Sequence, residues 1–254
     1  MGPWPPSVVR AARGKVGPLS RRFEELDWQD TGMGEISLRR RLEPTLQVDV
    51  FEVKLGEEFL MSSLFPVAEI ELARLGLAAC AGDDLDVVVG GLGLGYTAAS
   101  VLEDPRVRSL AVVEALAPVI GWHERRLLPD VAGLADDPRT RLVHGDFFAL
   151  AAGDGGFGQG SPERLHAVLL DIDHTPRHVL HPSHAPFYGP HGLRALRRHL
   201  HPRGVFALWS DDPPDEDFLA LLRAEFAAAE GHVVPFANPL TGGTSANSVY
   251  VAVA

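Results

Sequence analysis

The chain has 254 residues, 46% hydrophobic and 22% charged, which predicts a globular protein with one main domain and an appendage. No apolar run approaches about 18 residues, so we expect no membrane helix, and the net charge of −11 argues against binding to nucleic-acid phosphates. A single cysteine, Cys80, excludes an internal disulfide and fits a reducing compartment, so we expect a cytoplasmic protein.

The N-terminal quarter differs in composition from the rest. Residues 1–22 are rich in Pro, Gly and Arg, with no acid before Glu24, and we expect a flexible basic arm. Residues 23–64 are predicted to form a small β-hairpin region. Apolar and polar side chains alternate over 35–39 and 46–55, and a Gly56 turn follows.

From residue 65 onward, strand patterns alternate with helix patterns. Helices are predicted at 67–79, 96–102, 120–128, 192–200 and 215–230, and strands at 87–89, 110–113, 141–144, 167–171, 205–210, 233–236 and 248–253. This alternation predicts an α/β, Rossmann-like, doubly wound and mostly parallel sheet over residues 65–254. The last two strands permit an antiparallel C-terminal edge strand.

A glycine cluster follows the first strand of this domain. Gly91, Gly93 and Gly95 alternate with leucines, and glycine lets a backbone turn tightly and approach a ligand closely. Tyr96 stands where a dinucleotide fingerprint has its third glycine, which favours a mononucleoside-like ligand over NAD. The alternative is a tight turn without a ligand.

Three acids end consecutive predicted strands: Glu114, Asp146 and Asp171. The carboxyl ends of parallel strands line one crevice, so we expect the three to converge there. Glu114, roughly 20 residues beyond the loop, would accept the hydroxyls of a ribose. Asp146 would accept the exocyclic amine of an adenine, and Asp171 would reach the reacting end. Each acid could instead cap a helix.

Five short motifs carry a more specific resemblance. They are Gly90-Gly-Leu-Gly-Leu-Gly, Val113-Glu-Ala, His144-Gly-Asp-Phe-Phe, Leu170-Asp-Ile-Asp-His-Thr-Pro and Phe187-Tyr-Gly. Together they resemble the spermidine synthase (polyamine aminopropyltransferase) branch of the class I S-adenosylmethionine-dependent methyltransferase superfamily. The resemblance runs from about residue 35 to the C-terminus and is strongest over 86–114 and 143–176.

The resemblance implies an adenosyl-sulfonium donor, either S-adenosylmethionine or its decarboxylated form, and a homodimer. It implies that the glycine loop, Glu114 and Asp146 bind the donor, with Glu114 on the ribose and Asp146 on the adenine. It also implies that Asp171 handles the acceptor amine.

The sequence departs from the family pattern at the polyamine-binding positions. Gly93 stands where the family usually has an aspartate that pairs with the donor's aminopropyl amine. The family's Tyr-His-Glu segment is reduced to its last residue, Glu69, which we assign to substrate binding. The family's Asp-x-x-Asp-Pro becomes Asp171-Ile-Asp173-His174-Thr-Pro. Because a polycation needs several acids to offset its desolvation, these losses favour ordinary S-adenosylmethionine as the donor.

For either donor the reaction is an in-line attack on a carbon attached to S⁺, which requires an unprotonated acceptor. Asp171 or Asp173 would bind the acceptor amine and His174 would remove its proton; a solvated loop histidine is the alternative reading of His174. Tyr188 would line the acceptor pocket or pack in the core.

Histidines crowd the segment 174–191, beside Asp171 and Asp173. Imidazole and carboxylate together suit a metal ion. The spacing matches no defined metal signature, so we expect no metal and interpret the segment as a lid over the substrate.

The sequence therefore predicts an enzyme that transfers a methyl group from S-adenosylmethionine to a small amine-bearing molecule. Aminopropyl transfer from decarboxylated S-adenosylmethionine to a polyamine is the alternative. A binding protein that keeps the fold without turnover is the third possibility.

Overall fold

The computed structural model describes residues 22–254, so the predicted basic arm lies, except for Arg22, outside the described residues. The chain divides into two compact units, Met1–Leu60 and Met61–Ala254. Residues 61–64, which the sequence pattern assigned to the hairpin region, group with the second unit.

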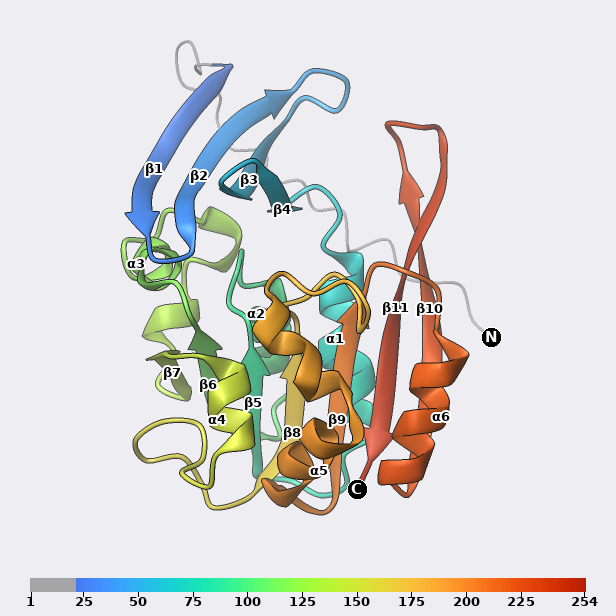
Figure 1. The fold of residues 1–254 in the computed structure, drawn as a ribbon. Coiled ribbons are helices and arrows are strands. Elements are labelled where there is room, and N and C mark those ends of the chain that lie inside the picture. The colour runs from blue at the N-terminus through green and yellow to red at the C-terminus, as the bar shows by residue number, and fades with distance from the viewer. Residues whose placement is uncertain (1–21) are drawn as a thin grey trace. The chain divides into compact units, whose positions relative to one another are not determined.

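The first unit is built on an antiparallel sheet in the order β1-β2-β3-β4 (Figure 1). Its strands are β1 (Phe23–Thr31), β2 (Gly34–Glu43), β3 (Val48–Leu55) and β4 (Glu58–Ser62), the last of which crosses the unit boundary. The alternating segments thus form the predicted hairpins. β1 lies inside the predicted hairpin region, although the sequence pattern assigned no separate strand to it because it lacks alternation; its register slips between Glu25 and Asp27.

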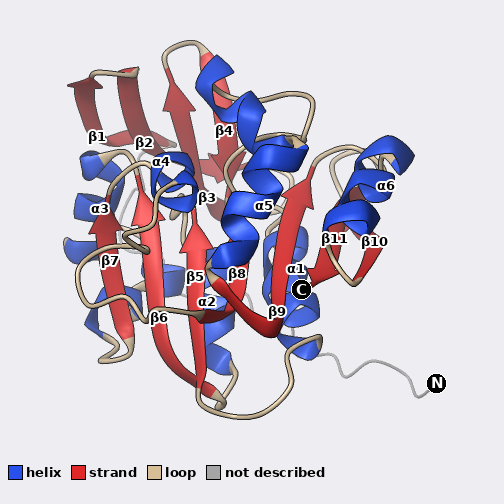
Figure 2. Cartoon of the chain, turned by 60° about the horizontal axis from the view of Figure 1, so that its bottom comes forward, coloured by secondary structure: helices blue, strands red, loops and turns tan. Residues whose placement is uncertain are grey.

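The second unit contains a seven-stranded sheet in the order β10-β11-β9-β8-β5-β6-β7 (Figure 2). Its strands are β5 (Leu85–Gly90), β6 (Val107–Glu114), β7 (Thr140–His144), β8 (Leu165–Leu170), β9 (Leu200–Ser210), β10 (Ala228–Asn238) and β11 (Gly243–Val253). The five strands from β9 to β7 pair in parallel. The sequence therefore predicted the fold class correctly.

The antiparallel strand is β11, which pairs with both β9 and β10. It lies one place in from the edge, and the edge strand is β10. A hairpin joins the two strands, so the chain passes to the edge first and returns beside β9.

Helices cover both faces of this sheet (Figure 2). One face carries α1 (Val67–Ala78), α2 (Tyr96–Glu103) and α3 (Ala117–Glu124); the other carries α4 (Phe147–Ala152), α5 (Pro190–Arg198) and α6 (Glu216–Glu225). Short 3-10 turns lie at Pro129–Val131, Leu134–Asp136 and Pro182–Tyr188. Gly76 of α1 packs so closely on the sheet that a Cβ there would lie 2.5 Å from Leu169.

The central strands are apolar throughout because both faces are covered. Every residue of β5 is buried, and Val168, Leu169 and Leu170 of β8 are fully buried. This rigid centre ends at Gly90 and Leu170, side by side in the register, which fixes where the following loops begin. Those loops carry the candidate site.

Candidate functional site

The glycine loop joins β5 to α2, and the close approach of a neighbouring strand determines its shape. Gly91 has a φ of +91°, and a Cβ there would lie 2.1 Å from the carbonyl oxygen of Asp171. The Asp171 N–H in turn donates to the carbonyl of Gly90 at 2.8 Å. Only glycine fits position 91, because both the backbone conformation and the space exclude a side chain.

The peptide group between Gly93 and Leu94 is held from two directions. Its carbonyl oxygen accepts a hydrogen bond from Nε2 of His123 on α3, at 2.9 Å. The Leu94 nitrogen of this peptide lies 3.2 Å from the sulfur of Met61 and donates a hydrogen bond to it. Gly93 has a φ of +45°, and a Cβ there would lie 2.6 Å from the Met61 thioether. The sequence prediction included Gly93 but neither of the side chains that hold it.

Glu114 ends β6 and binds the same loop. Its two carboxylate oxygens accept the N–H groups of Leu92, at 3.0 Å, and Leu116, at 2.8 Å. Burial raises the pKa of this carboxyl, and the backbone N–H groups oppose that shift. Glu114 thus reaches the loop from the neighbouring strand, as the ribose hypothesis requires.

Asp146 caps α4. Its Oδ1 accepts the N–H groups of Phe148, at 2.8 Å, and Ala149, at 3.2 Å. The capping alternative therefore describes this residue. These bonds use Oδ1 alone, so Asp146 can cap the helix and still offer Oδ2 to a ligand.

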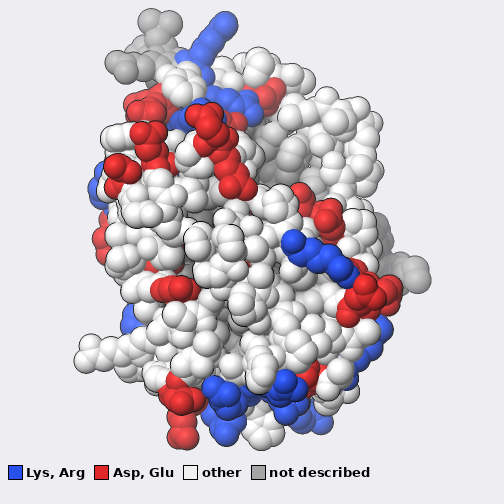
Figure 3. Space-filling model, in the orientation of Figure 1, with Lys and Arg blue, Asp and Glu red and all other residues white. Residues whose placement is uncertain are grey.

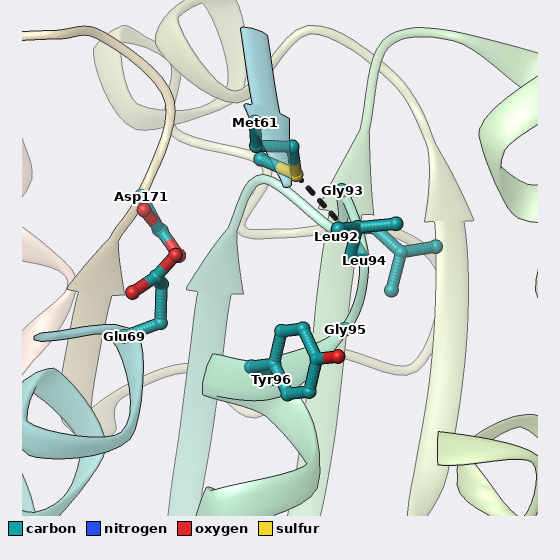
Figure 4. A pocket seen from close by; sticks show the side chains of 8 residues that line it. All are labelled: Met61, Glu69, Leu92, Gly93, Leu94, Gly95, Tyr96 and Asp171. Atoms are coloured by element: carbon teal, nitrogen blue, oxygen red, sulfur yellow. Dashed lines mark hydrogen bonds between the residues drawn. The ribbon is translucent and has the colours of Figure 1, made fainter. Parts of the chain in front are cut away.

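The centre of the site is a pair of carboxyl groups, Glu69 on α1 and Asp171 directly after β8. Figure 4 shows the two groups pointing toward each other on one side of the pocket, with Met61 and the glycine loop across from them. Thr97 of α2 donates to Oδ2 of Asp171 at 2.6 Å and lies 3.3 Å from the carbonyl oxygen of Glu69.

Burial shifts the pKa values of both carboxyls upward. Burial, and then the charge of Asp171, raises the pKa of Glu69 to about 8. Burial raises the pKa of Asp171 to about 6, against the opposing effect of the Thr97 hydrogen bond. Burial thus raises the pKa values of both carboxyls and favours a pair with one negative charge, which suits binding one ammonium group or accepting one proton.

Two further predicted residues, Asp173 and Tyr188, lie together in the core. Asp173 is 1% exposed, and its carboxylate accepts the Leu180 N–H at 2.7 Å, His184 Nδ1 at 2.8 Å and the Tyr188 hydroxyl at 2.8 Å. Both carboxylate oxygens are thus engaged in hydrogen bonds within residues 173–188. Neither Asp173 nor Tyr188 lines the pocket, which is bounded by Met61, Glu69, Leu92, Gly93, Leu94, Gly95, Tyr96 and Asp171.

None of the histidines in the 174–191 segment lines the pocket. The ring of His174 lies 4.9 Å from that of His178, His181 bonds Ser183, and His184 stacks on Phe148 with ring centroids 4.0 Å apart. His174 is outside the pocket lining. Within residues 22–254 no group of three or more His, Cys, Asp or Glu side chains is arranged to hold a metal ion.

On the face drawn in Figure 3, charged side chains of both signs form small groups separated by uncharged residues. No helix among the described residues is long and apolar enough to cross a membrane.

Comparison with known proteins places the fold. No protein-family model and no curated protein matches this chain. The crystal structure of spermidine synthase from Thermotoga maritima superimposes with a TM-score of 0.66 and 15% sequence identity, covering 90% of this chain and 72% of that one. A spermidine synthase in complex with the transition state analogue AdoDATO matches with a TM-score of 0.66, 17% identity and the same coverage.

The chain has a spermidine synthase-like fold. The resemblance read from the motifs is thereby confirmed at the level of architecture. In this spermidine synthase-like fold, the glycine loop, Glu114 and the Glu69–Asp171 pair share the carboxyl end of the central strands.

Proposed function

We propose that this chain transfers an aminopropyl group from decarboxylated S-adenosylmethionine to an amine acceptor such as a polyamine. The observation that carries the proposal is the Glu69–Asp171 pair beside the glycine loop, in a fold shared with spermidine synthases. The complex of one such enzyme with a transition state analogue supports the decarboxylated donor. The order of the two transfer reactions is therefore the reverse of the one that the sequence departures favoured.

Each group in the proposal has a task that its position supports. Glu114 offers its remaining acceptor capacity to the ribose, and Asp146 offers Oδ2 to the adenine amine. The Glu69–Asp171 pair, with one negative charge, binds the acceptor ammonium, and Asp171 takes its proton. The acceptor nitrogen then forms a bond to the methylene carbon on S⁺, the carbon–sulfur bond breaks, and its electrons remain on sulfur in 5′-methylthioadenosine.

Methyl transfer from S-adenosylmethionine is the second candidate. It is favoured by Gly93, which supplies no carboxylate for the ammonium at the end of an aminopropyl arm. The leaving product distinguishes the two reactions. Incubation with each donor and putrescine, followed by mass spectrometry, should yield 5′-methylthioadenosine and spermidine from the decarboxylated donor. Formation of S-adenosylhomocysteine with a methylated amine would instead establish methyl transfer.

Asp171→Asn tests the site. Loss of the proton acceptor should lower turnover about 100-fold or more, with the affinity for 5′-methylthioadenosine unchanged. Glu71→Gln is the matched control, because Glu71 lies on the same helix in an ion pair with Arg74. Undiminished turnover in Asp171→Asn would remove that residue from the mechanism. Donor binding without any product would identify a binding protein.

The proposed homodimer rests on the family resemblance. Light scattering coupled to size-exclusion chromatography of the full chain measures it directly.

A further inference from the structure

The Met61 side chain lies in the part of the pocket that faces the reacting groups. It lines the pocket together with Gly93, Leu94 and the Glu69–Asp171 pair (Figure 4). On the proposed function the adenosine binds elsewhere on the loop, at Glu114, whose carboxylate accepts the Leu92 N–H. On the proposed function, Met61 therefore borders the three-carbon arm of the donor.

The Leu94 N–H would be a carboxylate-binding group if it were free. His123 fixes its direction, because the bond from Nε2 to the Gly93 carbonyl leaves the N–H of the same peptide on the opposite side. His123 is 3% exposed and its other ring nitrogen is buried without a partner, so the imidazole donates through Nε2 in its neutral form. A backbone N–H held in this way binds anionic oxygen strongly.

Met61 occupies that N–H. Its sulfur accepts the hydrogen bond at 3.2 Å. The thioether also fills the space beside Gly93, because a Cβ on that residue would lie 2.6 Å from the thioether. The thioether is apolar and uncharged, so a carboxylate beside it would lose water without gaining a donor. An arm that ends in ammonium needs no such donor and can turn toward Glu69 and Asp171.

We propose that Met61 is a specificity-determining residue, which excludes the carboxylate of intact S-adenosylmethionine by covering the Leu94 N–H and filling the adjacent space. Gly93 complements Met61, since a Cβ at position 93 would lie 2.6 Å from the thioether and would force it to move. This chain would thus select the decarboxylated donor by leaving the carboxylate of the intact donor without space and without a hydrogen-bond donor. The inference rests on the proposed function and names the residue that sets its donor.

The experiment compares three ligands by calorimetry on the full chain. They are S-adenosylmethionine, its decarboxylated form, and 5′-methylthioadenosine, which lacks the arm. The wild type should bind the decarboxylated donor at least about tenfold more tightly than the intact one, the cost of a carboxylate without a partner. Met61→Ala frees the N–H and the space, and should reduce that ratio about fivefold or more.

Two controls isolate the arm. Affinity for 5′-methylthioadenosine should stay the same in every variant, because this ligand lacks the arm that Met61 borders. A change within about twofold counts as unchanged, since the smallest hydrogen-bond effects are of that size. Met61→Leu keeps the volume and loses the sulfur, so its ratio should fall between those of the wild type and Met61→Ala. It also preserves the test if Met61→Ala fails to fold.

The outcomes separate the two proposals. An unchanged ratio in both Met61 variants, or a wild type that prefers intact S-adenosylmethionine, overturns the role of Met61. If the wild type binds none of the three ligands, the proposed function itself fails. The predicted ratios without an aminopropyl product would uphold the role of Met61 and refute the transfer reaction.

Discussion

The hydroxyl of Thr97 donates a 2.6 Å hydrogen bond to Oδ2 of Asp171. Thr97 is 3% exposed, and its oxygen also lies 3.3 Å from the Glu69 carbonyl. The contact stabilises the ionised form of Asp171, whereas the hydrogen bond that opposes the raised pKa of Glu69 comes from the backbone of Glu69 itself. The Thr97 contact therefore favours ionisation of Asp171 against the effect of burial.

Thr97→Val should raise the pKa of Asp171. A hydrogen bond to a charged group contributes about 1.5–3 kcal/mol, which corresponds to roughly one to two pH units. The acid limb of the pH–rate profile should move upward by about that amount, so that activity falls more at pH 6 than at pH 8. Thr97→Ser keeps the hydroxyl and should restore the limb; an identical profile in Thr97→Val would contradict this role.

The raised pKa of Glu69 predicts how stability depends on pH. A carboxyl whose pKa rises from 4.5 in the unfolded chain to about 8 in the fold binds more protons when folded. Its contribution to stability is complete below about pH 4.5 and is lost as pH rises toward 8. Asp171 acts in the same direction between 3.8 and about 6.

Glu69→Gln should therefore melt at a higher temperature than the wild type at pH 8–9, with a flatter pH dependence. Differential scanning calorimetry across pH 5–9 measures both effects. Glu71→Gln again controls for the helix. A steeper loss of stability at alkaline pH in Glu69→Gln would show that the carboxylate is stabilising, contrary to the prediction.

The hydrogen bonds that Leu180, His184 and Tyr188 donate to Asp173 should stabilise the fold without affecting acceptor binding. Tyr188→Phe removes one of three donors to a buried carboxylate and should cost about 1–3 kcal/mol of unfolding free energy. The KM for the acceptor should not change, because Tyr188 bonds Asp173 and neither residue lines the pocket. Urea denaturation and steady-state kinetics check the two halves. A raised acceptor KM at full stability would favour the pocket role that the sequence suggested.

Position 91 tolerates no side chain. Gly91→Ala combines a left-handed backbone with a contact of 2.1 Å to the Asp171 carbonyl, and should cost roughly 2–5 kcal/mol. Gly121→Ala is the matched control, since Gly121 lies in helix α3 and a Cβ there meets nothing within 4 Å. It should gain about 0.5–1 kcal/mol. Thermal melting measures the stability of both variants. Equal melting temperatures for Gly91→Ala and Gly121→Ala would contradict the prediction.

The sequence by itself determined the sheet, the loop and the acids after the strands. Apolar runs ending in glycine or acid are typical of buried parallel strands, and β5, β6 and β8 lie within a few residues of their predicted places. Strand-end position alone was enough to bring Glu114 to the glycine loop and Asp171 to the pocket. These features are local in the chain, so their pattern carries the information.

Only the tertiary structure decided what each side chain contacts. Asp171 and Asp173 are two residues apart, yet one faces the pocket and the other is enclosed by Leu180, His184 and Tyr188. Met61, Thr97 and His123 carried no sequence signal, because each acts across elements separated by 30 or more residues. The pairing of Glu69 with Asp171 joins a helix to a strand end in the same way. Contacts of this kind depend on how helices pack over the sheet, which residue spacing does not encode.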